Sequence, residues 1–226
     1  RFIKQHRISL LHAEKIIGEL MEAILDQVET PVVAHEILGD AVSLYAEDSG
    51  EPGMADNIYA QTLKYFASFQ EKEAMLVSDC QICECSACLE VGKLKLKAIL
   101  HAGKAAFTRV RDIRKISGEP VILAHRLLKN SIPSDEYIIM TRAFADRCTT
   151  LPDGEDALVP YTEQCEGIGP VEIMVRNFEE REITPVPLSR FQKFRKMMKL
   201  TYYTSPRVIL GKAFPGKKKE FRNLPV

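Results

Sequence analysis

The 226-residue sequence has no apolar run near the length of about 20 residues that a membrane-spanning helix needs. It also has no visible signal peptide, Walker-type glycine loop, dinucleotide fingerprint or nucleophile triad. Its six cysteines are not spaced as a disulfide framework, because four of them fall within nine residues. These absences argue against a membrane protein, a disulfide-stabilised secreted domain and the common nucleotide-binding loops. They predict a globular cytoplasmic protein in a reducing compartment.

Charge is balanced over the whole chain but unevenly distributed. Of 31 basic and 31 acidic residues, eleven basic and one acidic lie in residues 187–226, which leaves 20 basic and 30 acidic residues in the rest. We predict a domain over residues 1–180 and a basic helical extension over 181–226, with its helix near 188–203. The extension either lies on an anionic membrane, binds an acidic partner, or packs its apolar face on the domain. Its lysine run gives no strong nucleic-acid signal.

Hydrophobic spacing predicts three helices and two strand pairs, with further strands toward the end of the chain. The helices are expected at 9–28, 56–77 and 119–130. The strands are expected at 32–38, 41–46, 93–100, 105–110, 137–140 and 171–175. Ser9 and Asp56 are expected to cap the first two helices, and residues 151–169 are interpreted as a loop. The regular alternation of residues 93–100 predicts a half-buried antiparallel strand that pairs with 105–110.

The sharpest local signal is the cluster Cys80, Cys83, Cys85 and Cys88 in the loop 79–89. Two Cys-x-x-Cys pairs present four thiolates, which suit tetrahedral zinc. The single residue between the pairs is tight, so Cys148, Cys165 or a histidine are alternative donors that would complete one pair. We predict structural zinc. The alternatives are iron–sulfur ligation, a redox switch and a set of unliganded thiols.

Two further segments carry residues suited to nucleotide chemistry. In 36–42, Gly39 precedes Asp40 between apolar runs, which predicts a tight turn that presents the carboxylate to a hard cation. In 118–127, a predicted helix start carries Arg126, whose guanidinium suits phosphate. The alternatives are a turn carboxylate that caps local amides and a surface arginine paired with Glu119 or loop carbonyls.

These segments, with Leu100-His101-Ala102-Gly103 between them, resemble the class III nucleotidyl cyclases, the adenylyl and guanylyl cyclase homology domain. More closely, the chain is similar to a little-characterised bacterial cyclase-like family that shares the run HRLLKN, here 125–130, and a nearby Cys cluster. The resemblance covers about residues 1–142. It implies an α+β fold with a ferredoxin-like antiparallel sheet and helices on one face, and places a first strand with a second metal-binding Asp before Phe2.

The resemblance also implies a homodimer that binds a nucleoside triphosphate with Mg²⁺ or Mn²⁺ on Asp40 and forms a 3′,5′-cyclic nucleotide. Arg126 would neutralise phosphate charge. The family's Asn four residues before it is Ile122 here, and Asn130 is the nearest substitute, one turn later. Base selection would fall to Glu36 and Lys115, which are as well suited to a cross-strand salt bridge.

Two alternatives to a cyclase follow from these departures. Ile122 and Lys115 favour a non-catalytic nucleotide-binding or dimerisation module with a structural zinc site, whereas Asp40 and Arg126 favour the enzyme. The third hypothesis is a zinc-stabilised interaction domain that docks a partner through its basic tail, with the cyclase-like sheet as a scaffold.

Overall fold

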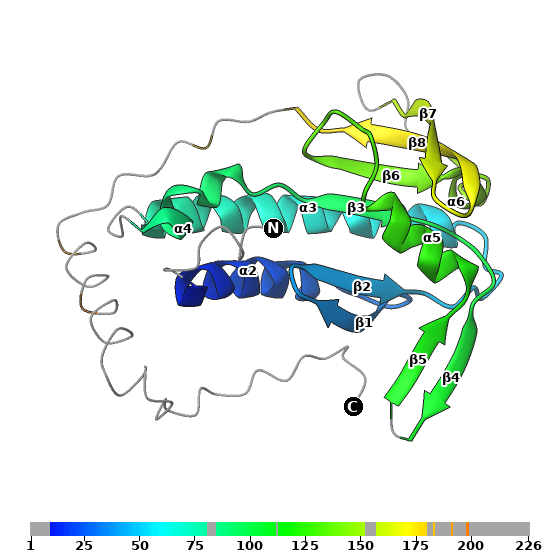
Figure 1. Cartoon of the computed structure of the whole chain (residues 1–226), viewed down its shortest axis with the longest axis horizontal. Coiled ribbons are helices and arrows are strands. Elements are labelled where there is room, and N and C mark those ends of the chain that lie inside the picture. Colours follow the sequence, from blue (N-terminus) through cyan, green and yellow to red (C-terminus); the bar gives the residue numbers. More distant parts are fainter. Residues whose placement is uncertain are drawn as a thin grey trace. The chain divides into compact units, whose positions relative to one another are not determined.

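The computed structural model describes residues 10–80, 85–111, 113–151 and 157–179, and the single residues 183, 191 and 198. It divides into two compact units, and each is described by itself. Of the described residues, unit 1 contains 10–46, 64–80, 85–94, 183, 191 and 198, and unit 2 contains 47–63, 95–111, 113–151 and 157–179. The long helix α3 (Met54–Asp79) contributes its first part to unit 2 and the rest to unit 1 (Figure 1).

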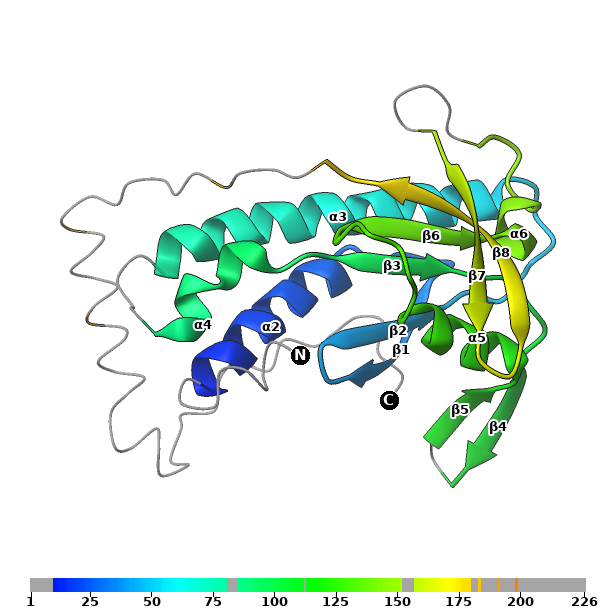
Figure 2. The ribbon, with the colours of Figure 1, turned by 45° about the horizontal axis from the view of Figure 1, so that its top comes forward.

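Unit 1 is built on helix α2 (Leu10–Leu25), which lies beside the second part of α3 and the short helix α4 (Ser86–Leu89) (Figures 1 and 2). Apolar residues three and four positions apart give α2 and α3 one buried face each. The buried positions include Ala13, Ile16, Leu20 and Ile24 on α2, and Tyr65, Phe66, Phe69 and Leu76 on α3. Burial of each large side chain stabilises the unit by about 1.5–3 kcal/mol.

Polar contacts also join α2 to α3. Lys72 Nζ lies 2.8 Å from Glu19 Oε2, and Ser68 Oγ donates a hydrogen bond of 2.9 Å to the carbonyl of Ala23. A 3-10 turn over Val91–Lys93 follows α4, and Ala87 and Val91 are fully buried. This burial anchors the Cys-rich segment to the helices of unit 1.

Strands β1 (Val33–Leu38) and β2 (Ala41–Tyr45) form an antiparallel hairpin in unit 1. Gly39 has a φ of 66° at the turn, a left-handed conformation that favours glycine. The ladder has a bulge between Ala34 and Glu36. The predicted strand-turn-strand over 32–46 is therefore confirmed.

Unit 2 contains a four-stranded sheet in the order β3-β6-β8-β7. Its strands are β3 (Lys97–Leu100), β6 (Tyr137–Thr141), β7 (Val159–Cys165) and β8 (Gly169–Asn177). β3 is parallel to β6, and the other neighbours are antiparallel. Every residue of β6 is buried, as expected for a central strand that reads as one apolar run.

Helix α5 (Glu119–Leu127) packs on this sheet. Its residues Leu123 and Leu127 share a core with residues of three strands. The strand residues are Tyr137, Ile139, Cys165, Ile173 and Val175. Pro120 occupies the first turn of α5, as predicted, because a missing N–H costs nothing there.

A second hairpin, β4 (Ala106–Val110) with β5 (Ile113–Ser117), projects from unit 2 next to α5 (Figures 1 and 2). The short helix α6 (Arg142–Ala145) follows β6 directly. The order of elements confirms the predicted α+β class.

Three local predictions are wrong. The strand expected at 93–100 begins at Lys97 and pairs in parallel with β6, while 106–110 pairs with the unpredicted strand β5. The stretch interpreted as a loop contains β7, whose mostly exposed edge position requires little apolar sequence. Helix α3 begins at Met54, so Asp56 lies in its first turn instead of capping it.

The larger architectural predictions have mixed outcomes. The described strands form three separate sheets, so the single ferredoxin-like sheet stays a prediction. Ser9, Cys83 and nearly all of the basic extension 181–226 lie outside the described residues. The domain boundary near residue 180 therefore also stays a prediction.

Candidate metal centre and predicted nucleotide residues

Three potential metal ligands converge in unit 1. His12 Nδ1 lies 3.3 Å from Cys85 Sγ and 3.8 Å from Cys88 Sγ. All three ligand atoms lie within 4.8 Å of one another, and the side chains are partly buried. An imidazole nitrogen and two sulfurs at these separations form a group that could hold a metal ion.

The local structure explains this convergence. Cys85 immediately precedes α4 and Cys88 lies within it, so a spacing of three residues puts both sulfurs on one side of a single turn. His12 lies near the start of α2, the helix that contacts α4. The three potential ligand atoms are therefore positioned by packing between two helices, and His12 and Cys85 are 73 residues apart in the chain.

The cluster differs from the predicted four-thiolate site. Cys85 and Cys88 take part, but Cys80 lies outside the group of three, and Cys83 is not among the described residues. A histidine was one of the donors that the spacing left open, although no sequence signal singled out His12. Its separation from the cysteines hides it from any local motif.

The two remaining cysteines belong to unit 2. Cys148 is half-buried with its sulfur 3.9 Å from the carbonyl of Phe144, and Cys165 is buried in the sheet core. Burial raises the pKa of both thiols. A raised pKa disfavours the thiolate, which is the form that binds metal.

Asp40 lies at the exposed tip of the β1–β2 hairpin. Glu36 is exposed on β1, where its backbone position faces Ser43 of β2. Both predicted site residues are therefore exposed, and both lie on the β1–β2 hairpin of unit 1. Binding of Mg²⁺ or Mn²⁺ by Asp40 stays a prediction.

Arg126 points from α5 toward the turn between β7 and β8. A Cβ at Gly167 would lie 3.2 Å from Arg126 Nη1, so the guanidinium packs against the bare backbone of that glycine. Arg126 Nη1 is buried and has no hydrogen-bond partner in the described part of the chain. The positive charge of Arg126 also acts on Cys165, where it partly opposes the effect of burial on the thiol pKa.

The side chain of Asn130 is held by hydrogen bonds within unit 2. Its Nδ2 donates to the carbonyl of Leu127 and to the hydroxyl of Tyr137, each at 2.6 Å, and its Oδ1 accepts from the amide of Ile132 at 3.0 Å. Both amide hydrogens are therefore engaged in closing the end of α5 onto β6. A nucleotide phosphate would have to displace one of these bonds, and the predicted catalytic role stays a prediction.

Lys115 is exposed on β5, opposite Thr108 of β4. It belongs to unit 2, whereas Glu36 belongs to unit 1, and the predicted pairing of the two is not tested. His101 follows β3 and forms a hydrogen bond of 2.8 Å between its Nδ1 and Thr141 Oγ1. Burial lowers the pKa of His101.

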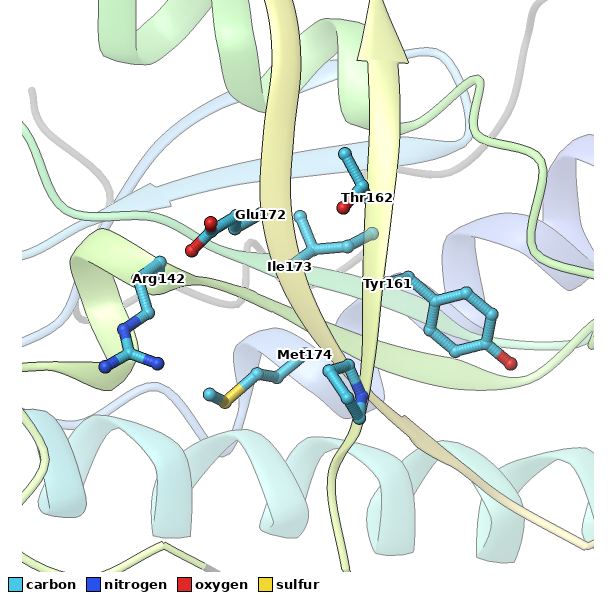
Figure 3. A pocket seen from close by; sticks show the side chains of 7 residues that line it. Arg142, Tyr161, Thr162, Glu172, Ile173 and Met174 are labelled. Atoms are coloured by element: carbon cyan, nitrogen blue, oxygen red, sulfur yellow. The ribbon is translucent and has the colours of Figure 1, made fainter.

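A pocket of about 340 Å³ lies on strands β7 and β8 of unit 2. Figure 3 shows Arg142 and Glu172 on one side of β8 and Tyr161 directed to the other side. Arg142 Nε is already paired with Asp146 Oδ1 at 2.7 Å. None of the predicted site residues lines this pocket.

Comparison with known families assigns the chain to one of them. A family model described as "Protein of unknown function (DUF2652)" matches residues 17–137, a little over half of the sequence. The chain belongs to this family. The matched segment includes the Asp40 turn, the potential metal ligands Cys85 and Cys88, and Arg126, whereas His12 precedes it.

A related bacterial protein extends this relationship. The chain is 29% identical over 154 residues to "Uncharacterized protein Rv2561/Rv2562" of Mycobacterium tuberculosis (strain ATCC 25618 / H37Rv). The match covers 68% of this chain and 69% of that protein. Neither the family description nor the name of this relative states an activity, so the cyclase resemblance stays a proposal. In the part of the chain that the structure describes, none of the helices has the length and apolar character needed to span a bilayer.

Proposed function

We propose that this protein is a diverged class III nucleotidyl cyclase-like domain that binds a nucleoside triphosphate with Mg²⁺ or Mn²⁺. The observation that carries the proposal is Arg126, whose buried Nη1 has no hydrogen-bond partner among the described residues. A buried donor without an acceptor costs about 1–3 kcal/mol, and more when it is charged. A phosphate oxygen is a suitable acceptor, because guanidinium groups bind phosphate through parallel hydrogen bonds.

Asp40 is the proposed ligand for the divalent ion. Its carboxylate follows a left-handed glycine at an exposed hairpin tip, where a hard cation can reach it with most of its water shell. The ferredoxin-like sheet of the cyclases belongs to the same proposal. Each unit of the chain carries one of the two motif residues, Asp40 in unit 1 and Arg126 in unit 2.

A homodimer is the proposed working form. Ile37 and Leu38, next to the Asp40 turn, are 48% and 42% exposed. They supply apolar surface that a second copy would cover, as the resemblance to cyclases, whose active sites form between two such domains, implies. The basic extension is a further proposed contact, with an anionic membrane or an acidic partner.

The second candidate is nucleotide binding without turnover. The position of the cyclases' catalytic Asn is occupied by Ile122, which is 52% exposed and has no polar group. The nearest substitute, Asn130, has both amide hydrogens engaged within unit 2. These two observations favour a regulatory or dimerisation module over an enzyme.

One experiment separates these candidates. Each of ATP, GTP, CTP and UTP is incubated with the protein and Mn²⁺, binding is measured by calorimetry, and 3′,5′-cyclic product is sought by mass spectrometry. Asp40→Ala and Arg126→Lys should weaken binding at least about tenfold, because the first removes the metal-binding carboxylate and the second replaces the paired guanidinium donors by a single ammonium group. Asp26→Ala and Arg142→Lys are matched controls at exposed positions of the same units.

The outcomes are distinct. A cyclic product that the wild type forms and Asp40→Ala does not supports the cyclase. The variants Glu36→Ala and Lys115→Ala then test whether these two residues determine which nucleotide base is preferred. Binding without product supports the non-catalytic module. If none of the four nucleotides binds the folded protein, the nucleotide proposal is wrong.

A further inference from the structure

We propose that His12, Cys85 and Cys88 are ligands of one zinc ion that ties helix α2 to helix α4 within unit 1. This inference does not depend on the nucleotide proposal. It also differs from a four-cysteine site, because one ligand is His12 of α2, a residue that precedes both the Cys-rich segment and the family-matched residues 17–137.

The distances agree with tetrahedral zinc. Zinc–nitrogen bonds of about 2.0–2.1 Å and zinc–sulfur bonds of about 2.3 Å, at a tetrahedral angle, put nitrogen and sulfur about 3.6 Å apart. The observed separations of His12 Nδ1 from Cys85 Sγ and Cys88 Sγ are 3.3 and 3.8 Å, on either side of this value. The two nitrogen–sulfur separations are therefore close to those that a single tetrahedral ion would impose, and the two sulfurs lie within 4.8 Å of each other.

Hydrogen bonding alone explains the cluster less well. A neutral imidazole nitrogen either carries one proton or offers one lone pair, so Nδ1 makes one good hydrogen bond. Here two sulfurs from the same helical turn approach that one atom. A shared ion accounts for all three positions at once, because it attracts each donor independently.

The donor set selects the metal. Two thiolates and an imidazole are the ligands of zinc and of other borderline or soft ions, whereas Mg²⁺ and Ca²⁺ prefer oxygen. On binding, each thiol releases its proton to solvent and its sulfur donates an electron pair to the ion, while neutral His12 donates its Nδ1 lone pair. The fourth tetrahedral position accepts water or one further donor.

This site has a structural consequence. His12 and Cys85 are 73 residues apart, so the ion would cross-link two segments whose contact otherwise depends on packing. Ala87 and Val91 are the fully buried apolar residues around the Cys88 turn. With so short a helix, α4 gains much of its order from the ion, as in other small metal-bound elements.

The test uses the full chain and four variants. Bound zinc is counted by mass spectrometry of metals, and the zinc Kd is measured by competition with a chelator. Cobalt replaces zinc for absorption spectra, in which the sulfur-to-cobalt charge-transfer band reports the number of thiolates. The variants are His12→Ala, the ligand exchange His12→Cys, and the controls His125→Ala and Cys148→Ser, which lie in unit 2.

We expect one zinc per chain in the wild type and both controls. His12→Ala should raise the zinc Kd about a hundredfold, because one of four ligands supplies about a quarter of the binding free energy of a structural zinc. His12→Cys should keep the zinc and strengthen the charge-transfer band by one thiolate.

Two results would overturn the proposal. One is a wild-type chain that binds no zinc. The other is a His12→Ala chain with the wild-type Kd and cobalt spectrum. If His12→Ala does not fold, His12→Cys decides: an unchanged thiolate count shows that residue 12 is not a ligand.

Discussion

Replacement of Asn130 by alanine tests whether this residue serves the fold or a nucleotide. Its side chain makes three hydrogen bonds, to the carbonyl of Leu127, the hydroxyl of Tyr137 and the amide of Ile132. Tyr137 is almost fully buried in the central strand β6, so its hydroxyl has few other partners. Asn130→Ala removes all three bonds and leaves this end of α5 without its link to the sheet.

The expected loss is about 3 kcal/mol of the free energy of unfolding, at about 1 kcal/mol for each hydrogen bond. A buried tyrosine hydroxyl without its donor adds to the loss, and a water molecule that enters the space of the amide reduces it. With a urea slope of about 2 kcal/mol per M, the midpoint of unfolding should fall by about 1.5 M.

Urea denaturation followed by far-ultraviolet circular dichroism and tyrosine fluorescence measures this shift. The chain contains no tryptophan, so tyrosine emission is not masked. Because the chain forms two units, two transitions are allowed for, and the one that exposes Tyr137 is used. Asn57→Ala is the matched control, since Asn57 is exposed on α3 and alanine is the better helix former.

The reasoning is refuted if Asn130→Ala unfolds within about 0.25 M of the wild-type midpoint. If that variant also loses nucleotide binding, Asn130 acts on the ligand, as the cyclase resemblance implies. A large shift in stability with binding retained at low urea would assign Asn130 to the fold and strengthen the case for a non-catalytic module.

Three other outcomes are expected. Removal of zinc by a chelator should lower the thermal midpoint of the wild type by more than that of His12→Ala, as measured by calorimetry, since the ion stabilises the folded state by mass action and the variant binds it more weakly. The backbone amide of Thr149 donates to Asp56 and lowers the pKa of this carboxyl below its usual value. Its contribution to stability is therefore present above the unfolded-state pKa and lost as pH falls through the folded-state pKa, and Asp56→Asn should flatten this acid-side decline in the unfolding free energy. Gly39→Val should cost about 1–2 kcal/mol in urea titrations, because Gly39 has a φ of 66°, and a wild-type midpoint would show that the turn relaxes.

Local chemistry was sufficient for several elements. The Gly39-Asp40 hairpin, the apolar strand β6 and the start of α5 at Pro120 each depend on residues that are neighbours in the chain. Their conformations follow from backbone freedom, burial and a missing N–H, and these are readable in a window of a few residues.

The tertiary structure alone decided the pairings. The alternation of apolar and charged residues indicated a strand near Lys97–Leu100 but not that its partner is β6. Strands pair through backbone hydrogen bonds, which do not depend on the side chains. β7 was not predicted because an exposed edge strand has few buried apolar residues, so its sequence shows no clear apolar pattern. Of the candidate metal ligands, the cysteine spacing indicated Cys85 and Cys88 directly, whereas His12 reaches them only through the packing of α2 on α4. Spacing predicts donors on one turn of chain, but a donor 73 residues away is selected by the fold.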